Sequence, residues 1–282
     1  MKMKKSTRRE LAYQTLDIIK EGKYFANGRS QLIGVDTQNA IDNSVLYTPE
    51  DFADVRHEAQ RSLSAPRQTT VFEVNNETTL DACRRLATEE GEENVLALNF
   101  ASARNAGGGF LGGAQAQEES LARSSSLYPT LTANETYYTV NRAQRSLYYT
   151  DHMIWSPKVP VFRQDDGELI PSYLVSFLTA PAVNAGALKN NNPTQLEGVK
   201  EAMRERIQKV LDLCVVNKHD VLVLGAWGCG VFRNKPEDIA ELFGDHLLRG
   251  AYQGVFKKVV FAVLDNAKEQ IIAPFSEQFN NK

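Results

Sequence analysis

The residues of this chain best suited to chemistry are a glycine-rich segment and the carboxylates that follow it. Residues 105–113 read Asn-Ala-Gly-Gly-Gly-Phe-Leu-Gly-Gly, and Gln117, Glu118 and Glu119 come soon after them. Glycine has no Cβ, so main-chain N–H groups in such a segment can close around an anion or a sugar. A carboxylate beside a sugar can donate or remove a proton at a glycosidic bond. The combination predicts a site that binds a phosphorylated sugar and cleaves it.

Each of these two features also has a simpler interpretation. Glycine-rich segments often form tight turns, and this one lacks the Gly-Lys-Ser/Thr ending of a Walker loop. Glu118 and Glu119 could begin a helix, where acidic side chains offset the helix dipole, and Glu119 could pair with Arg123 four residues later. The proximity of the two features favours chemistry, because a carboxylate shielded from water beside a bound anion should hold its proton more tightly. Such a group suits acid–base catalysis near neutral pH.

A second glycine-rich segment could bind an anion. Residues 225–234 read Gly-Ala-Trp-Gly-Cys-Gly-Val-Phe-Arg-Asn, and Pro236 starts a predicted helix just after them. The free N–H groups at a helix N-terminus attract anions, and Arg233 could add a charge-assisted hydrogen bond to a phosphate. The alternative is that these glycines only allow a sharp turn. Phe232 is the aromatic residue best placed to pack against a nucleoside, because it leaves this segment.

The elements that must position these segments alternate between apolar strands and helices. The pattern predicts strands at 70–74, 94–100, 173–178, 221–224 and 258–264, and helices at 78–89, 194–217 and 236–249. This alternation predicts a layered α/β fold. Both glycine-rich segments follow a predicted strand directly. In such folds ligands bind outside the carboxyl ends of strands, near a topological switch point, so we expect both segments to face one ligand.

Residues 1–69 lack the regular alternation of strands and helices that the rest of the chain shows. The pattern predicts a helix over 5–24, a second helix from Pro49 to Ser62, and strand-like pieces at 31–33 and 44–47. Residues 63–69 are expected to link this part to the rest. We therefore predict an N-terminal, mainly helical extension over 1–69 and a catalytic domain over 70–282.

Composition limits the kinds of partner that this chain can have. Its 282 residues are 42% hydrophobic and 24% charged, with a net charge of −3 and a pI near 5.9. A strongly basic surface for nucleic acid is not expected, and neither a signal peptide nor an apolar run of about 18 residues is found. The three cysteines and four histidines are too scattered to predict a disulfide framework or a metal cluster. We expect a cytoplasmic protein without a metal or cofactor.

The first segment resembles the signature of a known family. Residues 107–109, seven intervening residues and Gln117-Glu118-Glu119 are similar to the GGG-x(6–8)-QEE signature of poly(ADP-ribose) glycohydrolases. The chain looks like the bacterial type, whose catalytic domain is an ADP-ribose-binding macrodomain, and the second glycine-rich segment is similar as well. The likeness runs from about Thr70 to about Leu264, and residues before it resemble the helical extension of microbial members. The resemblance implies a macrodomain-like, three-layer α/β/α fold with a mixed central sheet.

The resemblance also implies a role for each site residue. Glu119 would be the catalytic acid and base, and Glu118, also catalytic, would hold a ribose hydroxyl. Asn105 would bind the ribose beside the scissile bond, and Phe232 would pack against that ribose. Residues 75–79 lie where macrodomains often place an adenine contact. The full set of expected substrate-binding residues is Asn105, Gly107, Gly108, Gly109, Gln117, Gly228, Cys229, Gly230, Val231 and Phe232.

The resemblance implies a glycohydrolase that cleaves the ribose–ribose O-glycosidic bonds of poly(ADP-ribose) and releases ADP-ribose. A hydrolase of mono-ADP-ribose on protein side chains or nucleic acid is an alternative, because the ADP-ribose half of the substrate is shared. A non-catalytic ADP-ribose reader is another, although a reader has no need for the second carboxylate. Neither a membrane partner nor sequence-specific binding to nucleic acid is expected.

Overall fold

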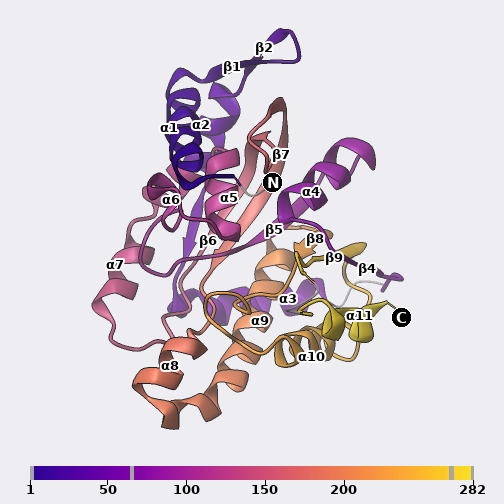
Figure 1. Cartoon of the computed structure of the whole chain (residues 1–282). Helices are drawn as coiled ribbons and strands as arrows, with labels where there is room; N and C mark the ends of the chain where they lie inside the picture. The colour runs from indigo at the N-terminus through magenta and orange to yellow at the C-terminus, as the bar shows by residue number, and fades with distance from the viewer. Residues whose placement is uncertain (1–2, 64–66, 267–269, 281–282) are drawn as a thin grey trace.

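A mixed sheet of seven strands lies between two layers of helices in the computed structural model, which describes residues 3–63, 67–266 and 270–280 (Figure 1). The strand order is β3-β6-β7-β5-β8-β9-β4. Strands β7, β5, β8, β9 and β4 run parallel, and β6 and β3 are antiparallel to their neighbours. The strands are β3 (Val45–Tyr47), β4 (Val71–Asn75), β5 (Val95–Phe100), β6 (Met153–Arg163), β7 (Leu169–Ala180), β8 (Val221–Leu224) and β9 (Lys258–Ala262). The predicted α/β class with a mixed central sheet is confirmed.

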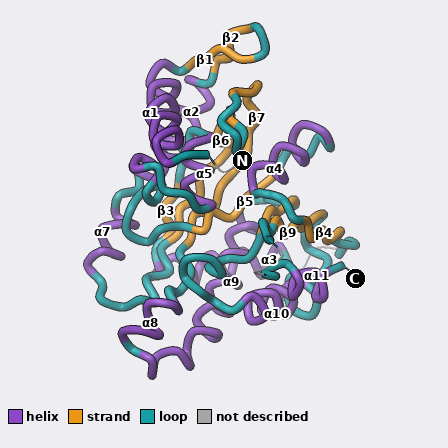
Figure 2. Tube along the Cα trace, viewed as in Figure 1, coloured by secondary structure: helices purple, strands orange, loops and turns teal. Residues whose placement is uncertain are grey.

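Helices cover both faces of the sheet, as Figure 2 shows. Side chains alternate across a strand, so Leu96 and Leu98 of β5 face one layer while Val95 and Ala97 face the other. The first layer contains α3 (Phe52–Ser62), α9 (Val199–Val216), α10 (Pro236–Leu247) and α11 (Ala273–Phe279). The second contains α2 (Gly34–Asp42), α4 (Thr79–Arg84), α5 (Gln117–Ser124), α6 (Leu127–Ala133) and α7 (Thr136–Ala143).

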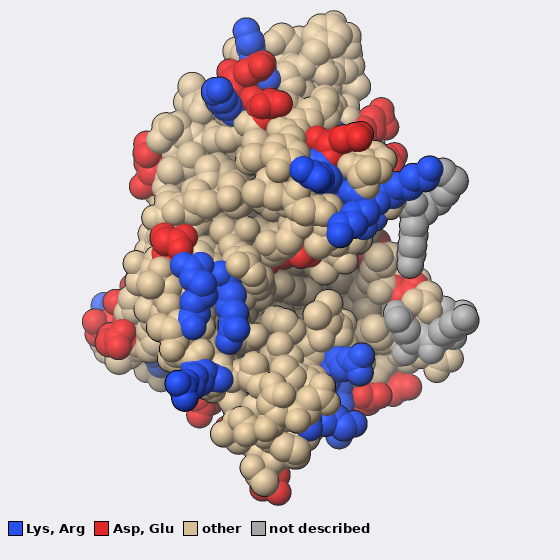
Figure 3. Space-filling view, turned by 60° about the vertical axis from the view of Figure 1, so that its left-hand side comes forward, with Lys and Arg blue, Asp and Glu red and all other residues tan. Residues whose placement is uncertain are grey.

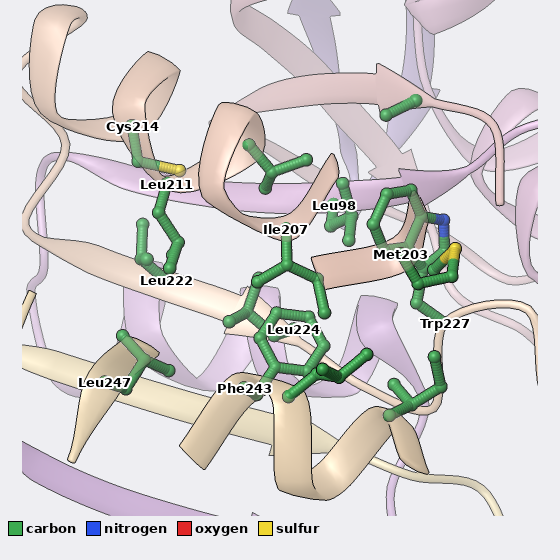
Figure 4. Close-up of a cluster of buried hydrophobic side chains, with 14 of the residues drawn as sticks. Leu98, Met203, Ile207, Leu211, Cys214, Leu222, Leu224, Trp227, Phe243 and Leu247 are labelled. Atoms are coloured by element: carbon green, nitrogen blue, oxygen red, sulfur yellow. The ribbon is translucent and has the colours of Figure 1, made fainter. Parts of the chain in front are cut away.

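The larger core packs α9 and α10 against β8. Ile207 of α9, Leu224 of β8 and Phe243 of α10 meet at its centre (Figure 4). The helix predicted over 194–217 is present, but α9 begins at Val199, because a 3₁₀ turn at Pro193–Gly198 comes first. Glycine is costly inside a helix, which explains why the regular helix starts after this turn.

The N-terminal part contributes to the main sheet as well as forming its own structure. Helix α1 (Lys5–Glu21) and the hairpin of β1 (Lys23–Ala26) and β2 (Arg29–Leu32) lie at one end of the molecule, at the top of Figure 1. Strand β3, however, pairs with β6, and α3 packs on α9. The division into 1–69 and 70–282 stays a prediction, and residues 64–66 of the expected link lie outside the described residues.

Several elements were not predicted from the sequence. They include α2, α6, α7, α11 and the short helix α8 (Ala185–Asn191). The helix expected over 78–89 is α4 followed by a π-helical turn at Arg85–Glu89. In the parts of the chain that the structure describes, every helix is too short or too polar to cross a membrane.

Candidate active site

Both glycine-rich segments leave the carboxyl ends of neighbouring parallel strands. The first follows β5 and the second follows β8, and these strands pair in parallel register. From β5 the chain continues to β6 and β7 on one side, whereas from β8 it continues to β9 on the other. The two segments therefore meet at a topological switch point, where ligands bind in open α/β sheets.

The first glycine loop packs directly against the two carboxyl groups. Gly107 and Gly108 have φ of +65° and +60°, a left-handed conformation that favours glycine. A Cβ at Gly108 would clash with Oε1 of Glu119 and lie 3.3 Å from Oε2 of Glu118. A Cβ at Gly107 would lie 2.9 Å from the ring of Phe110. Glycine at 108 lets the main chain approach the two carboxyl groups, and glycine at 107 lets it pack closely on Phe110.

Glu119 is held by the main chain of this loop. Its Oε1 accepts a hydrogen bond of 2.9 Å from the amide of Gly109, and its side chain is half-buried. It lies in the first turn of α5, as the simpler interpretation expected. The ion pair with Arg123 that this simpler interpretation allowed is absent from the described part of the chain, because the Arg123 guanidinium donates to the carbonyl of Ala114 at 2.9 Å instead.

Glu118 is the carboxyl group that is shielded from water. It is 3% exposed, and its Oε2 accepts a hydrogen bond of 2.6 Å from the amide of Ser102. Burial raises the pKa of Glu118 to about 8, and the neighbouring charge of Glu119 adds to the rise, while hydrogen bonds from Ser102 and Asn99 oppose it. Glu118 is therefore largely protonated at neutral pH, and the proton retention expected near this site falls on Glu118.

Gln117 ties the start of α5 to the end of β5. Its amide group donates to the carbonyl of Leu98 at 2.8 Å and to Oγ1 of Thr79 at 3.1 Å, and its oxygen accepts from the amide of Phe100 at 2.9 Å. These bonds give Gln117 a role in positioning the loop that the sequence did not reveal. Its contact with substrate stays a prediction.

The second glycine loop is fixed by a buried asparagine, and part of its main chain is exposed. Gly228 has φ of +76°, and a Cβ there would clash with Nδ2 of Asn234. That nitrogen donates to the carbonyls of Val183, at 2.9 Å, and Gly228, at 3.2 Å. Val231 is 78% exposed. Within the described ranges, the amides of residues 230–232 have no acceptor. Successive unpaired amides of this kind can bind an anion.

The side chains around the second loop pack against their neighbours, and the cysteine among them is not ionised. Phe232 is half-buried, and its ring centroid lies 5.9 Å from that of Tyr149. Its carbonyl accepts a hydrogen bond of 2.8 Å from the amide of Gly186. Burial raises the pKa of the Cys229 thiol, so this residue offers its main chain and not a thiolate. The exposed Arg233 packs its aliphatic stem on Gly186.

Known proteins identify the family to which this arrangement belongs. Residues 12–164 match the model of a family described as "Microbial-type PARG, catalytic domain". This chain belongs to the microbial-type poly(ADP-ribose) glycohydrolase (PARG) family. No curated protein sequence matches it.

Solved structures agree with this membership. The chain is similar to a poly(ADP-ribose) glycohydrolase from Thermomonospora curvata, with 44% identity, a TM-score of 0.90, and coverage of 97% of this chain and 100% of that one. A structure of the T. curvata enzyme bound to the inhibitor ADP-HPD matches with 43% identity, a TM-score of 0.87 and the same coverage. A PARG from Deinococcus radiodurans in complex with ADP-ribose matches with 47% identity and a TM-score of 0.81, over 88% of this chain and 98% of that one.

In this member of the PARG family, two site residues escaped the sequence analysis. Asn99 is fully buried in β5, and its Nδ2 donates to Oε1 of Glu118 at 3.3 Å and to Oγ1 of Thr179 at 3.1 Å. Ser102 supplies the amide that binds Glu118, and its hydroxyl accepts from the amide of Asn105 at 3.1 Å. The available signal was Asn99 itself, a polar residue within an otherwise apolar strand.

The predicted residues differ in how far they reach the open surface. Asn105 and Gly109 are exposed, whereas Gly107 is buried behind them. Figure 3 shows a hollow in one face of the molecule, with acidic atoms at its wall and basic side chains on both sides. Across the described residues, no group of three or more His, Cys, Asp and Glu side chains could hold a metal ion.

Proposed function

We propose that this PARG-family chain cleaves the ribose–ribose O-glycosidic bonds of poly(ADP-ribose) and releases ADP-ribose. Membership of the family, and similarity over nearly the whole chain to PARG structures that hold ADP-HPD or ADP-ribose, support this activity. Within the site, the observation that carries the proposal is the hydrogen bond of 2.9 Å from the Gly109 amide to Oε1 of Glu119. It holds one carboxyl group at the exposed side of a loop whose main chain approaches that group closely, because Gly108 has no side chain.

In the proposed mechanism Glu119 acts first as an acid and then as a base. Its proton passes to the ribose oxygen that departs, while positive charge develops at the anomeric carbon. The resulting carboxylate then takes a proton from the water that attacks this carbon. The bond from Gly109 fixes the orientation of the carboxyl group, which lowers the entropic part of the barrier.

Glu118 has a different proposed role, because it is buried beside Glu119. A protonated Glu118 places no negative charge next to the acid–base group, and it can hold a ribose hydroxyl by hydrogen bonding. Its pKa of about 8 supports this role, and the bonds from Ser102 and Asn99 fix its position. Asn105, exposed beside these groups, is proposed to bind the same ribose.

The second loop is proposed to bind the diphosphate. The unpaired amides of residues 230–232 and the N-terminus of α10 at Pro236 both favour an anion. Phe232 is proposed to pack against the ribose that this diphosphate carries. Gly107, Gly108 and Gly109 are proposed to complete the main-chain wall on the opposite side.

The decisive experiment is digestion of poly(ADP-ribose) by the wild type and by Glu119→Gln, with products resolved by chromatography. We expect the variant to lose release of ADP-ribose while calorimetry still detects ADP-ribose binding. Glu93→Gln, which alters an exposed glutamate without a described partner, should cleave normally. Cleavage by Glu119→Gln at the wild-type rate would remove Glu119 from the mechanism.

The same assay separates the alternative functions. Defined substrates that carry a single ADP-ribose on a protein side chain or a nucleic acid should be cleaved more slowly than polymer. If only these substrates are cleaved, the chain is a mono-ADP-ribose hydrolase. If the wild type binds polymer in a single turnover without cutting it, the chain is a reader.

The remaining expectations belong to the same proposal. We place the protein in the cytoplasm, because its cysteines Cys83, Cys214 and Cys229 are free and buried. We propose no sequence-specific nucleic-acid partner, since the net charge is −3. The unit that binds ADP-ribose is proposed to be 70–282, with 1–69 as an extension.

A further inference from the structure

Helix α1 lies against the first glycine loop, although more than eighty residues of chain separate the two. Ala12 packs with Phe110 of the loop and Ala122 of α5 in one small apolar cluster. Figure 1 shows α1 beside α5, at the same end of the molecule. The extension therefore contacts the element that carries Glu119.

Arg8 makes a directed contact with this loop. Its Nε donates a hydrogen bond of 2.9 Å to the carbonyl of Gly113, the last residue of the glycine-rich segment. Gly113 has φ of +75°, and a Cβ there would clash with the carbonyl of Lys5. The main chains of α1 and the loop thus touch without an intervening side chain, and the guanidinium fixes how they meet.

The hydrogen bonds of the loop connect Gly113 to Glu119. The amide of Gly113 donates to the carbonyl of Phe110 at 2.9 Å, which closes a tight 3₁₀ turn. The amide of Ala114 donates to the carbonyl of Gly109 at 3.1 Å. The amide of Gly109 in turn holds Oε1 of Glu119 at 2.9 Å. A displacement of Gly113 would therefore move the Gly109 amide, and with it the carboxyl group of Glu119.

A second arginine, Arg123 of α5, holds the neighbouring carbonyl. Nη1 of Arg123 donates to the carbonyl of Ala114 at 2.9 Å, next to the carbonyl that Arg8 holds. Burial lowers the pKa of Arg123, and the charge of Arg8 lowers it further. The hydroxyl of Thr15 in α1 also donates to the carbonyl of Arg123. Hydrogen bonds from both α1 and α5 therefore hold the end of the loop.

We propose that Arg8 is a positioning residue for the proposed acid–base reaction, and that α1 serves the active site by bracing the glycine loop. This inference rests on the proposed function and adds a role for the extension. Arg8 acts through Gly113, the turn and Gly109, and it does not touch substrate. A guanidinium suits this role, because a charged donor makes a stronger bond to a carbonyl than a neutral one.

The rival explanation is that Arg8 only fastens α1 to the rest of the molecule. In that case its loss would lower the melting temperature, but the folded enzyme would retain its kcat. If Arg8 positions Glu119 instead, its loss should lower kcat and leave the Kd for ADP-ribose nearly unchanged. Misplacement of the carboxylate by about 1 Å can lower a rate about 100-fold while the diphosphate site stays intact.

The test compares Arg8→Ala, Arg8→Lys and Arg9→Ala with the wild type, well below the melting temperature of every variant. Arg9 is the matched control, because it lies on the same helix, is exposed, and stacks over Tyr13 with its guanidinium carbon 5.8 Å from the ring centroid. The measurements are kcat on poly(ADP-ribose), Kd for ADP-ribose, and the melting temperature.

We expect Arg8→Ala to lower kcat by about 10-fold or more, with Kd for ADP-ribose changed less than about threefold. Arg8→Lys, which keeps a charged donor, should recover most of kcat, and Arg9→Ala should match the wild type. The inference is overturned if Arg8→Ala keeps the wild-type kcat, or if kcat and ADP-ribose binding fall together and lysine restores neither.

The wild-type reaction in the same assay separates this inference from the proposed function. A wild type that releases no ADP-ribose contradicts the proposed activity itself. An active wild type beside a fully active Arg8→Ala contradicts only the role of Arg8.

Discussion

The amide of Ser102 donates a hydrogen bond of 2.6 Å to Oε2 of Glu118, a carboxyl group that is 3% exposed. Next to it in sequence, Glu119 binds the Gly109 amide at the edge of the loop. Two adjacent glutamates on the first turn of α5 thus occupy different environments. One is buried and holds its proton, and the other faces the loop, so the two carboxyl groups can take the different roles proposed for them.

The first prediction concerns pH and stability. Burial raises the pKa of Glu118 from 4.5 to about 8 in the folded protein. Below the unfolded value both states are protonated, so no penalty arises. As the pH rises toward 8 the unfolded chain ionises freely while the folded protein must keep the proton or bury a charge, so the folded state loses stability. Glu118→Gln removes this penalty, and it should stabilise the fold at pH about 9 but hardly at pH about 4.

Urea unfolding at both pH values measures this difference. Glu93→Gln is the control, because Glu93 is exposed and has no partner in the described part of the chain. An equal effect of Glu118→Gln at the two pH values would show that Glu118 does not retain its proton in the folded state.

The second prediction concerns the close approach of the loop to Glu119. Gly108→Ala adds a Cβ that would clash with Oε1 of Glu119, at a residue with φ of +60°. The carboxylate must move, so we expect kcat to fall about 100-fold. Gly112→Ala is the matched control, since a Cβ there meets nothing within 4 Å and φ is not positive. Steady-state kinetics on poly(ADP-ribose) should show normal turnover for Gly112→Ala, and normal turnover of Gly108→Ala would contradict the site geometry.

The sequence predicted the parts of the site that local pattern determines. The apolar runs of β5 and β8 and the glycines after them placed both loops at the carboxyl ends of strands, as the structure has them. Helix α6 was missed, since Pro129 lies inside it; proline is tolerated there because it falls in the first turn. The pairing of β3 with β6 joins residues about a hundred positions apart, and no local pattern reports it.

The roles of individual side chains were also harder to predict, because they depend on contacts between residues that are distant in sequence. Gln117 stands in the signature, and its hydrogen bonds to residues of β5 and α4 were not predicted, while its expected contact with substrate stays a prediction. The simpler interpretation of the sequence paired Arg123 with Glu119 from spacing alone, yet Arg123 donates to the loop carbonyl of Ala114. Both outcomes depend on which main-chain groups the tertiary fold leaves unpaired at this edge of the sheet.

The third prediction follows from the hydrogen bonds of Gln117. Gln117→Ala removes bonds to Leu98, Phe100 and Thr79 and leaves main-chain groups at the end of β5 without partners. We expect a loss of unfolding free energy of about 2–4 kcal/mol. Gln144→Ala, at an exposed position whose side chain makes no described bond, should change it by less than about 0.5 kcal/mol. Urea denaturation measures both, and an unchanged midpoint for Gln117→Ala would show that these bonds do not hold β5 to α5.

The fourth prediction separates the second loop from the first. Nδ2 of Asn234 holds the carbonyls of Val183 and Gly228 behind the unpaired amides of residues 230–232. Asn234→Ala removes these two side-chain hydrogen bonds, so the amides lose their fixed direction and ADP-ribose should bind about 10-fold more weakly. Glu119 is held by the other loop, so kcat at saturating polymer should fall less than binding does. Asn190→Ala, at an exposed position of α8, serves as the control in calorimetric titration with ADP-ribose. If Asn234→Ala binds ADP-ribose as the wild type does, the diphosphate does not depend on this loop.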